Sequence, residues 1–220
     1  MEFAVDTEMS VSMPFANFHL DGLLYIPRVV AGVIVFAHGS GSDRHSPRNQ
    51  AIATALQKSH FATLLFDLLT SEEERVDRVT SEYRFDIPLL AERLVAATDW
   101  LRGIPALSTL PVGYYGASTG GSAALVAAAS MPDVVKAVVS RGGRADLAGD
   151  ALENVRAPTL LIVGSLDDMV IELNQEAKTR LMCESSLEII SGAGHLFAEP
   201  GKMVLVSQLA EAWFKRFLIG

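Results

Sequence analysis

From residue 33 to its end, this chain alternates short apolar runs with segments of helical spacing. The apolar runs are rich in β-branched and aromatic residues, as strands buried on both faces are. They lie at residues 33–37, 61–66, 111–115, 134–139, 159–163 and 187–190. Predicted helices separate them, at residues 47–58, 87–101, 118–130, 145–155, 171–181 and 203–217. Such alternation predicts an α/β fold, with a mostly parallel sheet and helices on both faces, in one domain over residues 1–220.

The segments that break this alternation also carry predictions. Residues 18–26 are a further predicted strand, and residues 8–13 are expected to pair with it as an antiparallel hairpin at one edge of the sheet. The acidic stretch at residues 72–74 is interpreted as a solvated loop or the start of a helix. Residues 139–158 leave room for little more than one short helix, so we expect no cap domain and an open, shallow site.

Composition excludes several classes of protein. The chain of 220 residues is 50% apolar and 20% charged, which is ordinary for a globular protein. A net charge of −8 argues against nucleic acid as a partner, because phosphates require clustered cations. No apolar run approaches the roughly 20 residues that span a bilayer, and the amino terminus lacks the basic start of a signal peptide. We therefore expect a cytoplasmic protein without a membrane partner, either a monomer or a homodimer.

A candidate nucleophile follows the predicted strand at 111–115. Residues 116–120 read Gly-Ala-Ser-Thr-Gly, a G-x-S-x-G pattern between a buried strand and an alanine-rich helix. Glycines at these positions permit a sharp turn that raises the serine hydroxyl above the sheet, near the positive end of the new helix. The pattern alone has low specificity, and its place between strand and helix gives it weight. We therefore predict Ser118 as the nucleophile.

A serine hydroxyl needs a base, and the base needs a carboxylate to orient it. Of the five histidines, His195 lies in a glycine-rich loop directly after the last predicted strand. Asp167 and Asp168 both follow the strand at 159–163, and we choose Asp167, because Asp168 would open the next helix. Parallel strands place their carboxyl ends at one edge, so Ser118, Asp167 and His195 are predicted to meet there.

The loop after the strand at 33–37 offers an oxyanion hole. Residues 38–42 read His-Gly-Ser-Gly-Ser, and a glycine-rich turn there can aim a backbone N–H at a developing negative charge. Ser40 is the first choice for this donor and Gly41 the alternative, with Thr119 as the second donor. A phosphate loop is the rival interpretation, but the required lysine is absent. No metal or organic cofactor is expected, because one cysteine and scattered histidines do not form a zinc site.

These motifs resemble the α/β-hydrolase superfamily, and within it the dienelactone hydrolase-like branch. The resemblance covers nearly the whole chain and rests on the amino-terminal hairpin and on residues 38–41, 116–120, 164–167 and 194–195. It departs at one point, since dienelactone hydrolases carry cysteine as nucleophile where this chain has Ser118. Cys183 is predicted near a helix end, away from the strand tips. The resemblance thus implies the fold and the triad, and gives little support to dienelactone as the substrate.

The predicted function is hydrolysis of small carboxylic esters through an acyl-enzyme. A thioesterase, amidase or perhydrolase on the same triad is the alternative, and a non-catalytic binding protein on this fold is a more distant one. Candidate substrate contacts are Arg44 and Arg141, for a substrate that carries a carboxylate, and Met169 and Phe197, which flank the predicted triad with Leu196. The competing interpretation of the arginines is a loop-fixing hydrogen bond, or an ion pair with the acidic residues 72–74 or with Asp67. The competing interpretation of the apolar residues is core packing.

Overall fold

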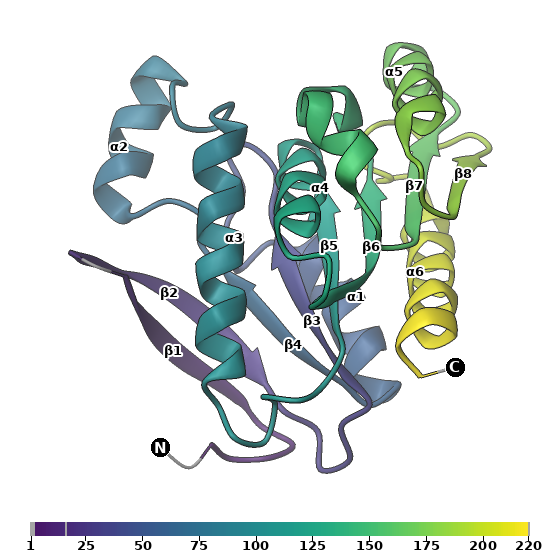
Figure 1. Cartoon of the computed structure of the whole chain (residues 1–220). Coiled ribbons are helices and arrows are strands. Elements are labelled where there is room, and N and C mark those ends of the chain that lie inside the picture. The colour runs from purple at the N-terminus through teal and green to yellow at the C-terminus, as the bar shows by residue number, and fades with distance from the viewer. Residues whose placement is uncertain (1–2, 16, 220) are drawn as a thin grey trace.

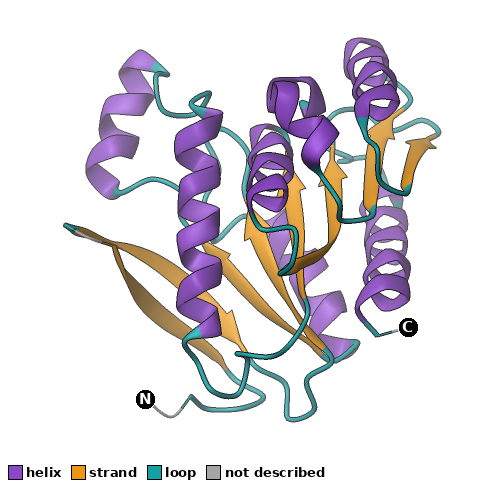
Figure 2. Cartoon of the chain, in the orientation of Figure 1, coloured by secondary structure: helices purple, strands orange, loops and turns teal. Residues whose placement is uncertain are grey.

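The computed structural model describes residues 3–15 and 17–219, and its centre is one sheet of eight strands. The strands are β1 (Glu8–Phe15), β2 (Phe18–Tyr25), β3 (Gly32–Ala37), β4 (Phe61–Phe66), β5 (Val112–Ala117), β6 (Val135–Arg141), β7 (Thr159–Gly164) and β8 (Ser185–Ile190). Their order across the sheet is β1-β2-β4-β3-β5-β6-β7-β8. Only β1–β2 and β2–β4 pair in antiparallel fashion. This arrangement is the α/β-hydrolase fold and confirms the predicted hairpin at one edge (Figures 1 and 2).

Helices cover both faces of the sheet. They are α1 (Pro47–Lys58), α2 (Ser71–Thr80), α3 (Ile87–Arg102), α4 (Thr119–Ser130), α5 (Asp168–Arg180) and α6 (Lys202–Leu218). One apolar cluster joins the sheet to α3, α4 and α5, and a second joins its other face to α1 and α6. Every residue of β3, β4, β5 and β7 is buried, as strands with cover on both sides must be. No helix in the part of the chain described has the length and apolar character needed to cross a bilayer.

The connection between β6 and β7 matches its prediction. It contains only η1 (Ala145–Asn154), a 3₁₀ segment interrupted at Gly149, whose φ is 55°. A connection this short cannot hold a cap domain.

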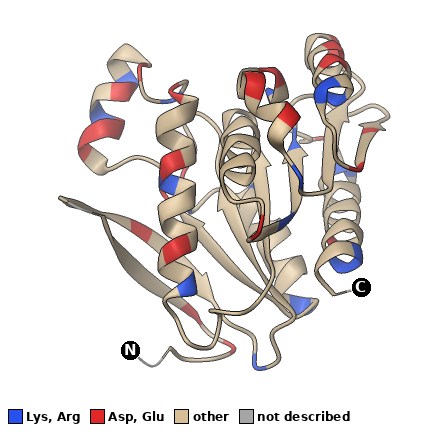
Figure 3. Ribbon diagram, viewed as in Figure 1, with Lys and Arg blue, Asp and Glu red and all other residues tan. Residues whose placement is uncertain are grey.

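Helix α2 goes beyond the prediction, which left residues 72–74 as a loop or a helix start. Thr70 caps the helix by accepting a hydrogen bond from the amide of Glu73, and the Glu73 carboxylate accepts one from the amide of Thr70 at 2.7 Å. Figure 3 shows acidic and basic residues along α2, which stands at the carboxyl end of the sheet. Because its sequence is mostly charged, α2 depends on ion pairs with its neighbours more than on apolar packing.

Candidate active site

Ser118 occupies a strained turn between β5 and α4. Its φ is 51° and its ψ −121°, a conformation that costs a residue with a Cβ on the order of 1–3 kcal/mol. Three backbone hydrogen bonds hold it there. The amide of Ser118 donates to the carbonyl of Arg141 at 3.1 Å, and its carbonyl accepts from Gly121 at 3.0 Å and Arg144 at 3.2 Å. Backbone strain fixed in this way is characteristic of functional sites.

The two glycines of the motif are required by close backbone contacts. A Cβ on Gly116 would lie 2.4 Å from the carbonyl oxygen of Gly120, and a Cβ on Gly120 would lie 2.2 Å from that of Ala37. Both distances are far below a permitted contact. The glycines therefore let α4 begin directly against β5 and the loop after β3, which brings Ser118 beside that loop.

His195 and Asp167 form a hydrogen-bonded pair. Nδ1 of His195 lies 2.6 Å from Oδ2 of Asp167. Asp167 follows the end of β7 by three residues and occupies the N-cap position of α5 without a side-chain capping bond, whereas Asp168 is the exposed first residue of α5. With Nδ1 donating to the carboxylate, Nε2 of the neutral imidazole is left as the acceptor, which is the tautomer a general base needs.

The turn after β6 joins the serine and the histidine. The backbone carbonyl of Arg141 accepts the hydrogen bond from the amide of Ser118. The next residue, Gly142, lies against the imidazole of His195, since a Cβ added to Gly142 would be 3.5 Å from Cε1 of that ring. In the described part of the chain no hydrogen bond links Ser118 Oγ to His195. Such bonds are often long in ligand-free sites and tighten when substrate binds.

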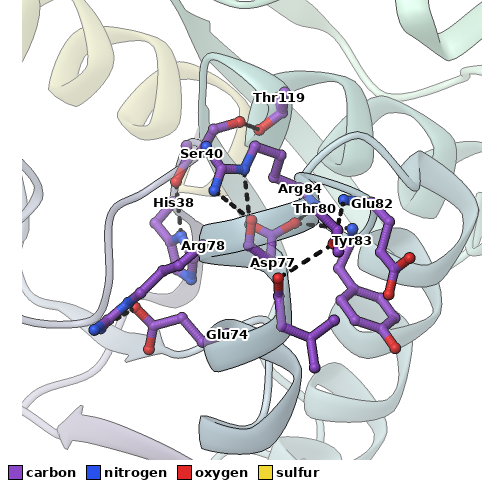
Figure 4. A network of polar contacts seen from close by, with 12 residues as sticks. His38, Ser40, Glu74, Asp77, Arg78, Thr80, Glu82, Tyr83, Arg84 and Thr119 are labelled. Carbon is purple, nitrogen blue, oxygen red and sulfur yellow. Dashed lines mark hydrogen bonds and ion pairs between the residues drawn. The ribbon is translucent and has the colours of Figure 1, made fainter.

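The predicted oxyanion donors also lie together. Oγ of Ser40 and Oγ1 of Thr119 are 3.2 Å apart (Figure 4). Among the residues described, the amides of Ser40, Gly41 and Thr119 donate to no protein acceptor, while the amide of Ser42 closes the turn onto Gly39 at 3.2 Å. Free amides at a helix N-terminus and a glycine-rich turn can receive a negatively charged oxygen.

His38 has a structural role that the sequence did not reveal. Its Nδ1 lies 3.0 Å from the carbonyl oxygen of Gly39, and its Nε2 accepts a hydrogen bond from the amide of Leu68 at 3.0 Å. Burial lowers the pKa of His38, so the ring is neutral and can serve both partners. It thereby ties the oxyanion loop to the segment after β4.

A cavity of about 360 Å³ opens beside Ser40 and Thr119. Helix α2 and the loop after it form one wall. Arg84 donates from Nε to Oδ2 of Asp77 at 2.7 Å and from Nη2 to its carbonyl at 2.8 Å, as Figure 4 shows. The charged residues that line the cavity are Asp43, Asp67, Glu74, Asp77, Arg78 and Arg84.

Asp77 is the best-anchored of these residues. Burial by itself would raise its pKa, but hydrogen bonds from Arg84 and from the amide of Tyr83 outweigh burial and hold the pKa below its ordinary value. The carboxylate therefore stays ionised and fixes the wall of the cavity. A second ion pair, between Glu73 and Arg93 at 2.7 Å, ties α2 to α3.

The structure changes the interpretation of the four candidate substrate contacts. Arg44 is paired with Asp67, through its guanidinium and through its amide at 2.8 Å, as the competing interpretation held. Arg141 is 6% exposed and Phe197 1% exposed, with the guanidinium carbon 5.9 Å from the ring centroid. Such burial leaves both residues no surface to offer a substrate. Met169 is 63% exposed and stays available.

Cys183 lies far from this constellation. Its thiol is 3.8 Å from the hydroxyl of Thr159, at the amino end of β7, while Asp167 follows the carboxyl end of the same strand. Burial raises the pKa of this thiol, which keeps it protonated and unreactive. Across the described residues, no group of three or more histidine, cysteine or carboxylate side chains is arranged to hold a metal ion.

Comparison with known proteins places this arrangement in a family. The sequence profile of the dienelactone hydrolase family matches residues 20–218. The chain belongs to the dienelactone hydrolase family. A dienelactone hydrolase from Anabaena variabilis has the same fold, with a TM-score of 0.94 and 55% identity, over 96% of this chain and 98% of that one. The family membership agrees with the resemblance drawn from the motifs.

More distant structures share the fold alone. Est1E from Butyrivibrio proteoclasticus superposes with a TM-score of 0.79 at 15% identity, over 94% of this chain and 98% of that one. Among curated proteins, one from Mycobacterium tuberculosis named "Putative phosphoribosyl transferase" is 55% identical over 199 residues. That match covers 90% of this chain and 44% of the relative, so the chain spans under half of the relative's length.

Proposed function

We propose that this chain is a serine hydrolase that cleaves small carboxylic esters, with Ser118 as nucleophile, His195 as general base and Asp167 as its orienting partner. One observation carries the proposal. Ser118 sits at a positive φ at the start of α4, and the turn after β6 contacts both Ser118, through Arg141, and His195 of the hydrogen-bonded His195–Asp167 pair, through Gly142. The fold does not require a strained serine at this position. A nucleophile that must project above the sheet does require such a turn.

The reaction follows from the roles of these groups. His195 takes the proton of Ser118 as Oγ attacks the ester carbonyl, and Asp167 stabilises the imidazolium that forms. The carbonyl oxygen becomes an oxyanion held by the free amides of Thr119 and of Ser40 or Gly41. His195 then protonates the departing alcohol, and water, activated by the same base, releases the acid from Ser118.

Rival activities differ in what the site would have to bind. A thioester or an amide could use the same triad, and kinetics must rank these substrates against esters. Phosphoribosyl transfer, named for the longer relative, is not favoured for this chain. The match covers only 44% of that relative, and the glycine-rich loop at residues 38–42 lacks the lysine of a phosphate loop.

The test is hydrolysis of p-nitrophenyl esters of increasing acyl length by the wild type, Ser118→Ala and Ser130→Ala. The wild type and Ser130→Ala, a control at the far end of α4, are expected to cleave short esters equally. Ser118→Ala is expected to lose on the order of a million-fold in kcat, down to the detection limit. Equal rates for wild type and Ser118→Ala would overturn the proposal.

A further inference from the structure

The loop after β3, residues 38–42, is packed against the candidate nucleophile. A Cβ added to Gly39 would lie 3.0 Å from Cβ of Ser118, closer than ordinary van der Waals contact. Ser40 follows Gly39 directly, and Thr119 follows Ser118 directly. The side chains of Ser40 and Thr119 therefore extend from the two segments that meet at the nucleophile.

The hydroxyl groups of Ser40 and Thr119 are paired. Oγ of Ser40 and Oγ1 of Thr119 are 3.2 Å apart, and both residues line the cavity of about 360 Å³ (Figure 4). In the part of the chain that the structure describes, neither hydroxyl has another hydrogen-bond partner. Two hydroxyls carry two hydrogens, and one hydrogen bond between them uses only one of these. One O–H donor is therefore left to act on a molecule in the cavity.

Burial decides which of the two hydroxyls keeps the unused hydrogen. Thr119 is 2% exposed, whereas Ser40 is exposed. A buried O–H donor without an acceptor costs free energy, and among the residues described Oγ of Ser40 is the acceptor that Thr119 has. Thr119 therefore donates to Ser40, and the hydrogen of Ser40 stays free. A hydroxyl that accepts one hydrogen bond donates a stronger one, because the two bonds polarise each other.

Ester cleavage supplies an acceptor beside Ser40. When Oγ of Ser118 attacks, its bond to the acyl carbon forms and an electron pair of the carbonyl moves onto the carbonyl oxygen. The amides of Thr119 and of Ser40 or Gly41 hold that oxygen, so it lies next to the Ser40 side chain. Negative charge develops on the oxygen only in this step, and a hydroxyl donates more strongly to a charged oxygen than to a neutral one.

We propose that the Ser40 hydroxyl is a further catalytic group, a third donor to the oxyanion, and that the Thr119 hydroxyl is a positioning group that orients it. The inference rests on the proposed function of the same site. Ser40 keeps its proton throughout. When the tetrahedral intermediate collapses, the carbonyl re-forms and the bond to the alcohol oxygen breaks, and His195 delivers to that oxygen the proton taken from Ser118. The Ser40 hydroxyl thus stabilises charge without entering the proton transfer.

Hydrolysis of p-nitrophenyl acetate by single variants tests the two roles. Ser40→Ala is expected to lose about thirtyfold in kcat with KM within about twofold of wild type, because the bond strengthens only as charge develops. Thr119→Val should lose about fivefold in kcat, and Thr119→Ser, which restores the hydroxyl, should recover the wild-type rate. Ser130→Ala, at the far end of α4, is the control and should match wild type. A wild-type kcat in Ser40→Ala would overturn the inference.

The double variant of Ser40→Ala with Thr119→Val separates positioning from direct action. Because the Thr119 hydroxyl acts through Ser40, removing it from a protein that already lacks the Ser40 hydroxyl should cause no further loss in kcat. Losses that multiply would give the Thr119 hydroxyl an independent role and would contradict the inference.

Exchange of the substrate's carbonyl oxygen for sulfur tests the contact itself. Sulfur is a weak hydrogen-bond acceptor, so the p-nitrophenyl ester of thionoacetic acid should gain little from a hydroxyl donor. Ser40→Ala is expected to lower kcat/KM by about thirtyfold for the oxygen ester and by about threefold or less for the thiono ester. An equal loss on both esters would mean that the substitution acts through the structure of the loop, and the inference would fall.

The two proposals fail in different ways. If the wild type cleaves no ester, or Ser118→Ala cleaves esters equally well, the proposed hydrolase function falls and the role of the Ser40 hydroxyl falls with it. If the wild type cleaves p-nitrophenyl acetate, Ser118→Ala does not, and Ser40→Ala is as active as the wild type, only the inference about the hydroxyl pair is wrong.

Discussion

Ser118 and its glycine neighbours show how a few backbone contacts position a nucleophile. The strained φ of Ser118 is sustained by hydrogen bonds from Gly121 and Arg144 and to Arg141, and the close approach of Gly120 to Ala37 leaves no room for a side chain. The position of the hydroxyl is thus set by backbone geometry, before any side-chain partner is considered.

Gly120→Ala is therefore expected to be severely destabilising, because its Cβ would overlap the carbonyl oxygen of Ala37 at 2.2 Å. Gly149→Ala is the matched control. Its φ of 55° disfavours a Cβ, but nothing lies within 4 Å, so the cost should be only about 1–3 kcal/mol. Urea unfolding compares the two variants. A Gly120→Ala protein as stable as Gly149→Ala would contradict the argument from close packing.

The two neighbouring aspartates provide a second test at this scale. Asp167→Asn should lower kcat for p-nitrophenyl acetate by about 10⁴, because an amide no longer holds the correct imidazole tautomer. Asp168→Asn should stay within about twofold of wild type, since Asp168 is exposed at the start of α5. Circular dichroism would establish that both variants are folded. Equal losses in the two variants would remove Asp167 from the proposed mechanism.

At the scale of residues, position after a strand could be predicted from the sequence. Ser118, Asp167 and His195 follow β5, β7 and β8, and parallel strands bring such residues to one edge. The sequence could not exclude Phe197 as a substrate contact, because its burial depends on tertiary packing. The hydrogen bonds of His38 to Gly39 and Leu68 likewise join segments that only the fold brings together.

At the scale of elements, α2 is the segment that the sequence left undecided. Its start could have been predicted, since Thr70 and Glu73 form a capping box, a pattern readable from residue spacing. The attachment of α2 to the rest of the protein could not have been predicted. The partner of Asp77 is Arg84 in the following loop, and the partner of Glu73 is Arg93 on α3, and charged residues alone do not specify such pairs.

The attachment of α2 should depend on pH through Asp77. The folded state lowers the pKa of this carboxyl, so its contribution is complete above the unfolded value of about 3.9 and is lost as the pH falls through the lower folded value. At neutral pH, Asp77→Asn should lower the free energy of local unfolding of α2 by about 2 kcal/mol. That difference from wild type should shrink below about pH 4.

Amide hydrogen exchange of α2, expressed as protection factors at each pH, measures this opening. Glu72→Gln is the control, because the Glu72–Arg75 pair is exposed and such pairs contribute little. A protection difference between wild type and Asp77→Asn that persists unchanged at pH 3 would contradict the role given to the Asp77 carboxylate.

At the scale of the whole molecule, one sheet separates two apolar clusters. Tyr114 and Tyr115 are adjacent in β5 and point to opposite faces, Tyr114 toward α3 and α4 and Tyr115 toward α1 and α6. The mostly parallel sheet, its edge hairpin and the cover on both faces could be predicted, because an alternation of buried strands and helices has few solutions. The strand order was not predicted, nor was the cavity, whose wall comes from α2 and the loop after it.

The two tyrosines also differ in their hydroxyl groups. The hydroxyl of Tyr114 lies 2.8 Å from Oγ1 of Thr98, whereas that of Tyr115 is buried with no hydrogen-bond partner among the described residues. Tyr114→Phe should therefore cost about 1 kcal/mol in the free energy of unfolding, and Tyr115→Phe should cost nothing or stabilise the protein. Urea denaturation of both variants compares these two costs. A larger cost for Tyr115→Phe than for Tyr114→Phe would contradict the prediction.

The central claim is that Ser118 is a nucleophile activated by His195. The most direct measurement is reaction of the purified protein with a fluorophosphonate, followed by mass spectrometry of its peptides. The account predicts one adduct, on the peptide containing Ser118, that is absent in Ser118→Ala and forms far more slowly in His195→Gln. A protein that stays unlabelled, or an adduct on another serine such as Ser40, would contradict the claim.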